Sequence, residues 1–295
     1  MSDHSRERHA ELVESVVALT PSEGLRDSSV PGFRAFRSDS TTDQDLAEYP
    51  LSLCVAVQGR KRVQVGDETY VYEPLTCLLV ALPLPLYAQI VEASPENPFL
   101  AVVLEIDTPL LAELELSLDP LGELPPEHEA VRLMPVEGEL LDSLTRLCRA
   151  SADPIDGKIL GTPLKREVIY RLLQSEHGGL LRSLAARDSR TRRVQSSIQF
   201  IRQNFEKRLS VQDIAAAAHM SESTFFEAFK HATSLSPLQY LKRYRLQKAR
   251  DLLLAGRVNA SQAALAVGYQ SPSQFSREFK SAFGAPPSQL RAIDA

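Results

Sequence analysis

The chain has 295 residues, of which 43% are hydrophobic and 24% are charged, the ordinary balance of a soluble globular protein. This length is more typical of two domains than of one. No stretch approaches the roughly 20 apolar residues that span a bilayer, and the N-terminus is mixed in charge and leads into an amphipathic segment instead of an apolar signal core. We therefore expect a cytoplasmic protein with no membrane partner.

Charge is distributed unevenly along the chain. Residues 192–295 contain 15 Lys and Arg against 7 Asp and Glu, whereas residues 1–191 contain 18 against 31. A basic third joined to an acidic remainder is typical of a protein in which only one domain meets a polyanion. A solvated basic surface would give the same asymmetry, so charge alone does not decide between the two.

Short apolar runs alternate with turn signals between residues 50 and 106. The runs predicted to be β-strands are 51–57, 63–65, 69–72, 77–80, 88–91 and 99–106. Gly66-Asp67, between the second and third runs, is typical of a β-hairpin turn. Many short antiparallel strands predict a small barrel or sandwich, and helices are expected to follow at 110–116, 138–150 and 161–174.

Histidines and cysteines do not form a recognisable metal or disulfide pattern. None of the six histidines lies on a predicted strand; they are His4, His9, His128, His177, His219 and His231. Cys54, Cys77 and Cys148 are odd in number and widely spaced, which argues against a disulfide framework and a metal site. We expect no catalytic residue, no metal and no cofactor. Cys54 and Cys77 are interpreted as buried apolar side chains, with redox or electrophile sensing as the alternative.

An apolar stripe runs along the helix expected at 138–150. It consists of Leu140, Leu141, Leu144 and Leu147. The stripe suits either a helix of a second chain, which would make a homodimer, or the barrel of its own chain. The short charged segment 184–192 is interpreted as the linker between an N-terminal domain, 1–183, and a C-terminal domain, 193–295.

An internal repeat occupies the C-terminal domain. Residues 221–230 (SESTFFEAFK) match residues 271–280 (SPSQFSREFK) at the first serine, both aligned phenylalanines and the final lysine, an offset of 50. The small apolar segments 215–218 and 264–267 match at an offset of 49, so the second copy has one extra residue in its turn. Two copies of one supersecondary unit are the simplest explanation.

Each copy is predicted to be a helix, a tight turn and a second helix. Ser210 is a good N-cap for the first unit, and His219 lies in its turn, since histidine tolerates a positive φ better than most residues. Gly268 makes the corresponding turn in the second unit. A long amphipathic helix at 237–254 joins the units, and another helix at 193–205 precedes them.

Residues 193–291 resemble the DNA-binding domain of the AraC/XylS family of bacterial regulators. The resemblance is strongest in the second unit, where AALAVGY at 263–269 is followed by SQFSREFK at 273–280 and FGAPP at 283–287. It implies two recognition helices, held apart by the connecting helix, that enter successive major-groove segments on one face of duplex DNA.

Residues 10–165 are similar to the N-terminal cupin-like domain of one subgroup of that family, through VAVQGRKRV at 55–63, GDE at 66–68 and EASP at 92–95. The resemblance implies a small barrel that receives an effector, with adjoining helices that mediate dimerisation. Many relatives have a Gly-His pair in the turn after Tyr72, where this chain has Leu75-Thr76.

The solvent-facing side of each recognition helix supplies the candidate DNA contacts. In the first unit these are Ser223, Thr224, Phe226, Glu227 and Lys230. In the second unit they are Ser273, Gln274, Ser276, Arg277 and Lys280. Arg277 is the leading candidate, as a bidentate reader of guanine, whereas Glu227 either accepts from a cytosine amine or is a solvated charge. Phosphate contacts are expected from Lys230, Lys280 and Arg243.

The expected fold class is therefore α+β with two domains: a cupin-like β-barrel with flanking helices, then an all-α domain of two helix-turn-helix units. Candidate effector-binding side chains are Arg34, Tyr70, Tyr72, Tyr87 and Gln89, each of which could instead serve only packing. The expected function is sequence-specific transcriptional regulation, with double-stranded DNA, a small-molecule effector and RNA polymerase as partners. The alternatives are a DNA-repair enzyme that transfers alkyl groups, which would need an activated cysteine, and a binding protein that works through its barrel alone.

Overall fold

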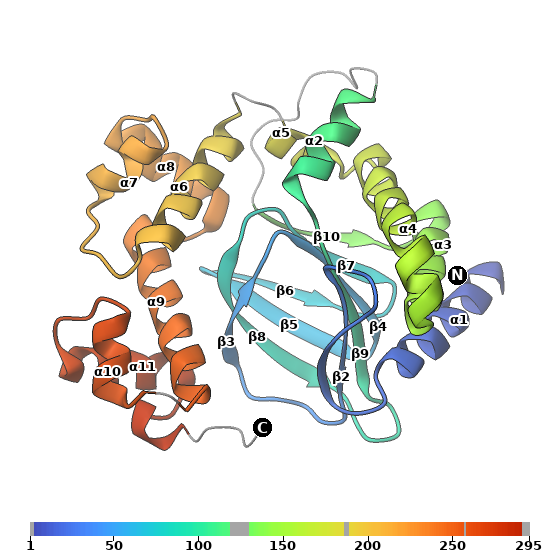
Figure 1. Cartoon of the computed structure of the whole chain (residues 1–295), viewed down its shortest axis with the longest axis horizontal. Helices are drawn as coiled ribbons and strands as arrows, with labels where there is room; N and C mark the ends of the chain where they lie inside the picture. Colours follow the sequence, from blue (N-terminus) through green and yellow to red (C-terminus); the bar gives the residue numbers. More distant parts are fainter. Residues whose placement is uncertain (1–2, 119–129, 186–188, 257, 291–295) are drawn as a thin grey trace.

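A computed structural model describes residues 3–118, 130–185, 189–256 and 258–290, in a β-rich N-terminal part and a helical C-terminal part (Figure 1). This arrangement confirms the predicted α+β class. The elements of the N-terminal part are α1 (Asp3–Leu19), β1 (Gly24–Asp27), β2 (Phe33–Ser38), β3 (Asp45–Tyr49), β4 (Ser52–Gln58), β5 (Arg60–Val65), β6 (Glu68–Tyr72), β7 (Thr76–Val80), β8 (Leu84–Glu92), β9 (Phe99–Glu105), α2 (Thr108–Leu116), β10 (Val131–Pro135), α3 (Gly138–Ala152), α4 (Pro154–Gln174) and α5 (Gly179–Ala185).

The C-terminal part is entirely helical. Its elements are α6 (Arg190–Asn204), α7 (Val211–Ala217), α8 (Glu222–Thr233), α9 (Pro237–Leu254), α10 (Ala260–Ala266), α11 (Pro272–Phe283) and the short 3-10 helix η1 (Pro287–Gln289). Helices α7 and α8 form the first helix-turn-helix unit, α10 and α11 form the second, and α9 joins them with the bounds predicted from its periodicity. None of the helices in the described parts of the chain is long and apolar enough to cross a membrane.

Two antiparallel sheets make up the N-terminal core. Among the described residues, one has six strands in the order β1-β2-β9-β4-β7-β10, and the other has four in the order β3-β8-β5-β6. The sheets face each other, since Lys61 of β5 reaches the rings of Phe36 on β2 and Phe99 on β9. Within the described residues the strand pairing does not join the sheets into a closed ring, so the expected barrel is an open one.

The hairpin predicted around Gly66 is present, with β5 and β6 paired and Gly66 at a φ of 58°. Leu75, in the turn after Tyr72, has a φ of 62°, an unusual conformation for a branched side chain. Strands β1, β2, β3 and β10 were absent from the prediction. Their charged residues interrupt the apolar alternation that would have identified them.

Helices α1, α3 and α4 cover the outer face of the six-stranded sheet, away from the helical C-terminal part (Figure 1). His9 of α1 is hydrogen-bonded through Nε2 to the carbonyl oxygen of Val57, at 2.8 Å. The leucine stripe of α3 is buried in its own chain; it comprises Leu140, Leu141, Leu144 and Leu147. The interpretation of this stripe as a dimer surface is therefore wrong, because the sheet and the flanking helices of the same chain occupy it.

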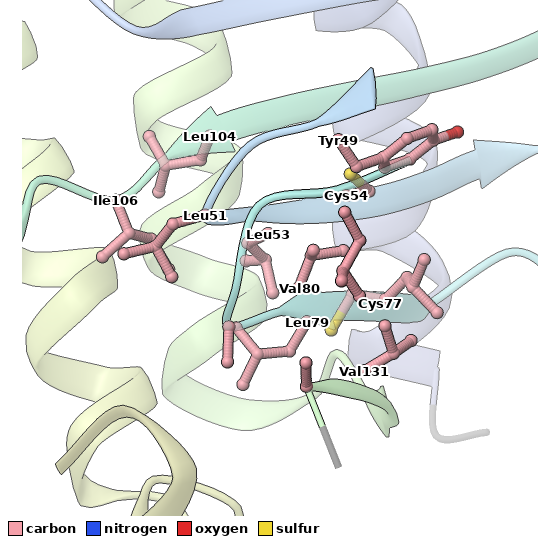
Figure 2. Close-up of a cluster of buried hydrophobic side chains, with 14 of the residues drawn as sticks. Tyr49, Leu51, Leu53, Cys54, Cys77, Leu79, Val80, Leu104, Ile106 and Val131 are labelled. Atoms are coloured by element: carbon pink, nitrogen blue, oxygen red, sulfur yellow. The ribbon is translucent and has the colours of Figure 1, made fainter. Parts of the chain in front are cut away.

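Figure 2 shows Cys54 and Cys77 among the buried side chains of neighbouring strands β4 and β7. Cys77 is opposite Val55 in the strand register, while Cys54 is opposite Leu78. Because successive side chains of a strand point to opposite faces, the two thiols lie on opposite faces of the sheet. Burial raises the pKa of both thiols. They are buried apolar side chains, as predicted.

Part of the predicted linker, 184–192, is helical. Helix α5 continues to Ala185, and α6 begins at Arg190 after a side-chain cap by Ser189. Residues 186–188, in the middle of the segment, lie outside the described residues, as does His128. The domain limits 1–183 and 193–295 remain predictions.

Candidate functional site

The first helix-turn-helix unit begins with a capping box. The backbone N–H of Asp213 donates to Ser210 Oγ at 3.1 Å, and the N–H of Ser210 donates to Asp213 Oδ2 at 2.8 Å. Two otherwise unsatisfied donors are thereby paired at the helix start. The turn that follows has His219 at a φ of 54°, as predicted from its position between the two helices.

The second unit repeats this construction with different residues. Asn259 and Gln262 form its capping box, which the sequence analysis did not identify, although Asn is as good an N-cap as Ser. Gly268 makes the turn with a φ of 86°. A Cβ on Gly268 would lie 2.4 Å from the carbonyl oxygen of Glu206, so glycine is needed here for close packing as well as for φ.

Paired phenylalanines determine which side of each recognition helix faces outward. Phe225 and Phe229 are buried with ring centroids 5.4 Å apart, and Phe275 and Phe279 repeat this distance. The opposite side of each helix therefore faces solvent. The candidate DNA-contacting side chains are exposed on it, apart from the half-buried Ser276: Ser223, Thr224, Phe226, Glu227, Lys230, Ser273, Gln274, Arg277 and Lys280.

Glu278, a residue that the sequence analysis did not select, organises the side of α11 next to the connecting helix. Its carboxylate accepts hydrogen bonds from Tyr269 Oη at 2.7 Å and from Gln274 Nε2 at 3.2 Å, and it lies 3.3 Å from Lys242 Nζ. Burial alone would raise the pKa of Glu278, but these donors and the lysine charge hold it below its ordinary value. Gln274 is thus positioned by its neighbour one turn along the helix.

The basic side of α9 is turned toward the N-terminal domain. Glu48 on β3 forms ion pairs with Arg202 of α6 at 2.7 Å and with Lys248 of α9 at 2.8 Å. Arg250 of α9 pairs with Asp45, the first residue of β3. Strand β3 therefore holds the connecting helix through ion pairs with its basic side chains.

Arg243 lies in the same interface. Its guanidinium carbon is 5.0 Å from the centroid of the Tyr87 ring, and burial lowers its pKa. The Tyr87 ring lies against the guanidinium in this domain arrangement, and the predicted contact of Arg243 with a DNA phosphate stays a prediction. The start of α9 also contacts that domain, where Tyr240 Oη donates to the carbonyl oxygen of Pro83 at 2.8 Å.

The five effector candidates divide between the two faces of the sheets. Three of them point into the space between the sheets: Arg34, Tyr70 and Tyr72. The strand register places Arg34 on the same face as Cys54, Tyr70 on the same face as Val63, and Tyr72 on the same face as Lys61. Tyr87 and Gln89 point to the outer face of the four-stranded sheet, because the alternate positions of β8 are the buried ones. Alternation along the strand thus places Tyr87 and Gln89 outside the space between the sheets, and a role of any of the five side chains in effector binding stays a prediction.

A lysine inside the barrel was missed by the sequence analysis. Lys61 Nζ lies 5.3 Å, 5.4 Å and 5.9 Å from the ring centroids of Phe36, Tyr49 and Phe99. Nearby, Arg34 pairs with Glu105 at 2.5 Å, and its Nε is buried without a hydrogen-bond partner in the described structure. We name Arg34, Lys61 and the rings of Tyr49 and Tyr72 the inner cluster. Among the described residues no group of His, Cys, Asp and Glu side chains is placed to hold a metal ion.

Comparisons with known proteins give the same two-part division. Residues 29–180 match the family described as AraC-type transcriptional regulator N-terminus, and residues 214–293 match the family described as helix-turn-helix domain. The probable transcriptional regulator LumQ of Photobacterium leiognathi is 28% identical over 141 residues, which are 45% of this chain and 57% of LumQ. The transcriptional activator RhaS of Escherichia fergusonii is 30% identical over 150 residues, 50% of this chain and 51% of RhaS. The chain thus spans about half the length of these curated relatives.

Solved structures share the fold over nearly the whole chain. An apo form of ToxT from Vibrio cholerae superposes with a TM-score of 0.58 at 13% identity, covering 89% of this chain and 98% of ToxT. ToxT bound to an unsaturated fatty acid gives 0.55 at 13% identity, covering 90% and 96%. These comparisons confirm the predicted resemblance. With the N-terminal match alone covering more than half of its residues, the chain belongs to the family of AraC-type transcriptional regulators.

Proposed function

We propose that this protein is a sequence-specific DNA-binding regulator of transcription whose N-terminal domain receives a small-molecule effector. The observation that carries the proposal is the pair of helix-turn-helix units in one chain, each with a phenylalanine-anchored recognition helix and a polar outer side. Two such helices joined by one rigid helix suit two successive major-groove segments. The relatives found are transcriptional regulators, which argues against the DNA-repair alternative.

The base contacts are assigned to the outer sides of α8 and α11. Arg277 is proposed to read a guanine through both guanidinium donors, and its exposure on α11 leaves the fork available. Ser223, Thr224, Phe226 and Glu227 on α8, and Ser273, Gln274 and Ser276 on α11, are proposed as the remaining base-facing residues. Lys230 and Lys280, at the far ends of the two exposed sides, are proposed to contact phosphates.

The inner cluster is proposed as the effector site. Its polar groups lie between two sheets, and Arg34 Nε is a buried donor without a hydrogen-bond partner in the described structure, which is favourable for a ligand that accepts a hydrogen bond. Small-molecule sites commonly combine apolar walls with a few such polar groups. The fatty-acid complex of ToxT supports a small-molecule ligand for a protein of this fold.

A homodimer is proposed to form through α4 instead of α3. Ile155, Ile159 and Leu160 at the start of α4 are 68%, 65% and 46% exposed, and contiguous exposed apolar side chains are typical of interaction surfaces. We further propose that this dimer works in the cytoplasm as a transcriptional regulator and acts on RNA polymerase.

The test is a selection of genomic DNA fragments by the full-length protein, followed by affinity measurements on selected and random duplexes at one fixed salt concentration. We expect the selected duplex to bind at least about 1,000-fold more tightly. Affinity that depends on salt but is equal for both duplexes would contradict sequence-specific regulation. Repeating the selection with and without metabolite fractions tests the effector half of the proposal.

A further inference from the structure

A cleft of about 460 Å³ separates the outer face of the four-stranded sheet from the second helix-turn-helix unit. Tyr87 of β8 lines it from the N-terminal domain. Lys242 and Arg243 of α9 and Gln274 and Arg277 of α11 line it from the C-terminal domain. This volume is typical of small-molecule sites, and the cleft is separate from the inner cluster because Tyr87 faces away from the sheet interior.

Cations elsewhere in the domain interface have carboxylate partners. Arg202 and Lys248 share Glu48, and Arg250 has Asp45. Because a buried charge is costly unless it is paired, these carboxylates explain how three cations are accommodated between the domains.

Arg243 differs from these three cations. It is half-buried against the Tyr87 ring, and its Nη1 is shielded from solvent with no hydrogen-bond partner in the described structure. Burial lowers the pKa of Arg243, and among the described residues it is Tyr87, not a carboxylate, that opposes this effect. A guanidinium in this position lacks the anion that its neighbours have.

The rest of the cleft adds positive charge. Arg277 forms no ion pair among the described residues, and Lys242 shares its one carboxylate, Glu278, with Tyr269 and Gln274. Three cations therefore line the cleft against a single acidic group that is already hydrogen-bonded. Guanidinium groups have the fork geometry that matches the oxygens of phosphates and carboxylates.

We propose that this cleft is a binding site for a small oxyanion, a phosphate or carboxylate compound held by Arg243 and Arg277 with the ring of Tyr87 as one wall. The site has a regulatory consequence that rests on the proposed function. Since Arg277 is proposed to read a base, an anion bound to Arg277 competes with DNA and holds α11 beside the N-terminal domain.

Calorimetric titration of the full-length protein tests the site directly, with inorganic pyrophosphate and with citrate as probes at constant ionic strength. We expect saturable binding of one probe per chain, weakened at least about tenfold in Arg243→Gln because a charged hydrogen-bonding partner is lost. Binding of pyrophosphate alone assigns a phosphate ligand, and binding of citrate alone assigns a carboxylate. Arg208→Gln is the matched control, since it removes the same charge from an exposed position outside the cleft.

Two further measurements keep the test independent of folding. Arg243→Lys retains the charge and loses the fork, so we expect binding weaker than in the unmodified protein but stronger than in Arg243→Gln. Thermal unfolding of each variant verifies that the fold is intact. Absence of saturable binding of both probes, or an equal loss in Arg208→Gln and Arg243→Gln, overturns the proposal.

Competition with DNA separates this inference from the proposed function. The bound probe should raise the Kd for a selected duplex in the unmodified protein and leave it unchanged in Arg243→Gln. Sequence-specific DNA binding without saturable probe binding removes the anion site and leaves the proposed function standing. Saturable probe binding without sequence-specific DNA binding removes the proposed function and leaves the anion site standing.

Discussion

His219 and Gly268 occupy equivalent turns in the two helix-turn-helix units, and both have a positive φ, 54° and 86°. The backbone requirement is shared, but the surroundings differ. A Cβ on Gly268 would meet the carbonyl oxygen of Glu206 at 2.4 Å, whereas His219 already carries a side chain. The turn at His219 therefore limits the residue type through its backbone conformation alone. The turn at Gly268 limits it through both the conformation and the space left for a side chain.

Substitutions at the two turns should have opposite effects on the free energy of unfolding. His219→Gly should raise it by about 0.5–1 kcal/mol, since the left-handed conformation costs a non-glycine residue ~1–2 kcal/mol and glycine loses about 0.5–1 kcal/mol in entropy. Gly268→Ala should lower it by more than 2 kcal/mol, roughly the sum of conformational and steric penalties. Urea unfolding measures both. Gly284→Ala is the control for φ alone, because its φ is 76° and nothing lies within 4 Å of the added Cβ; equal losses at positions 268 and 284 would contradict the packing argument.

Arg277→Ala should weaken binding to a selected duplex by about 1–3 kcal/mol and relax preference at one base position. The reason is that a bidentate contact discriminates between bases, whereas a phosphate contact does not. Fluorescence anisotropy on duplexes with single base changes measures this. Lys280→Ala serves as comparison, with a similar loss expected on every sequence. A uniform loss for Arg277→Ala would make it a phosphate contact instead.

Glu48→Gln should reduce the free energy of unfolding by about 1–3 kcal/mol, between the values for exposed and buried ion pairs. The side chain is 15% exposed and pairs with both Arg202 and Lys248, so its removal leaves Arg202 without this carboxylate and Lys248 with the longer ion pair to Asp251, at 3.6 Å. Urea unfolding of the full-length protein provides the measurement. Glu96→Gln, at an exposed position far from this interface in the sequence, should change stability by less than about 0.5 kcal/mol. A comparable loss in both variants would remove the interface explanation.

The three cysteines should not react with iodoacetamide in the native protein at mildly alkaline pH. Cys54, Cys77 and Cys148 are all buried, and burial raises the pKa of each thiol, which keeps the reactive thiolate scarce. Mass spectrometry after labelling tests this, with complete modification of all three expected once guanidinium chloride unfolds the chain. Rapid labelling of native Cys54 or Cys77 would revive the redox-sensing alternative.

Ile159→Glu should convert the proposed homodimer into a monomer. Ile159 is 65% exposed on α4, so the charge is tolerated in an isolated chain but would be buried without a partner in a dimer interface. Light scattering coupled to gel filtration measures the mass. The comparison variant is Val71→Glu, an exposed apolar residue on β6, which should leave the mass unchanged. A monomeric unmodified protein would contradict the proposal.

Local patterns were sufficient for most of the C-terminal domain. The 50-residue repeat, the bounds of α9 and the positive φ at His219 and Gly268 follow from periodicity, capping residues and turn chemistry, all of which act over a few neighbouring residues. The hairpin at Gly66 and the burial of Cys54 and Cys77 also follow from patterns among a few neighbouring residues. Local sequence patterns thus predict the two-domain plan, the paired helix-turn-helix units and the outward sides of their recognition helices.

Which residues contact Tyr87 and the basic side of α9 depends on the tertiary structure. Tyr87 was expected in the barrel, yet it lies on the outer face beneath Arg243, and the cations of α9 meet Glu48 and Asp45 about 200 residues earlier in the chain. No local period encodes such contacts, because they depend on how one domain is placed against the other. Sheet alternation allowed Tyr87 either face, and only the packing of α9 against β3 and β8 made the outer face an interface.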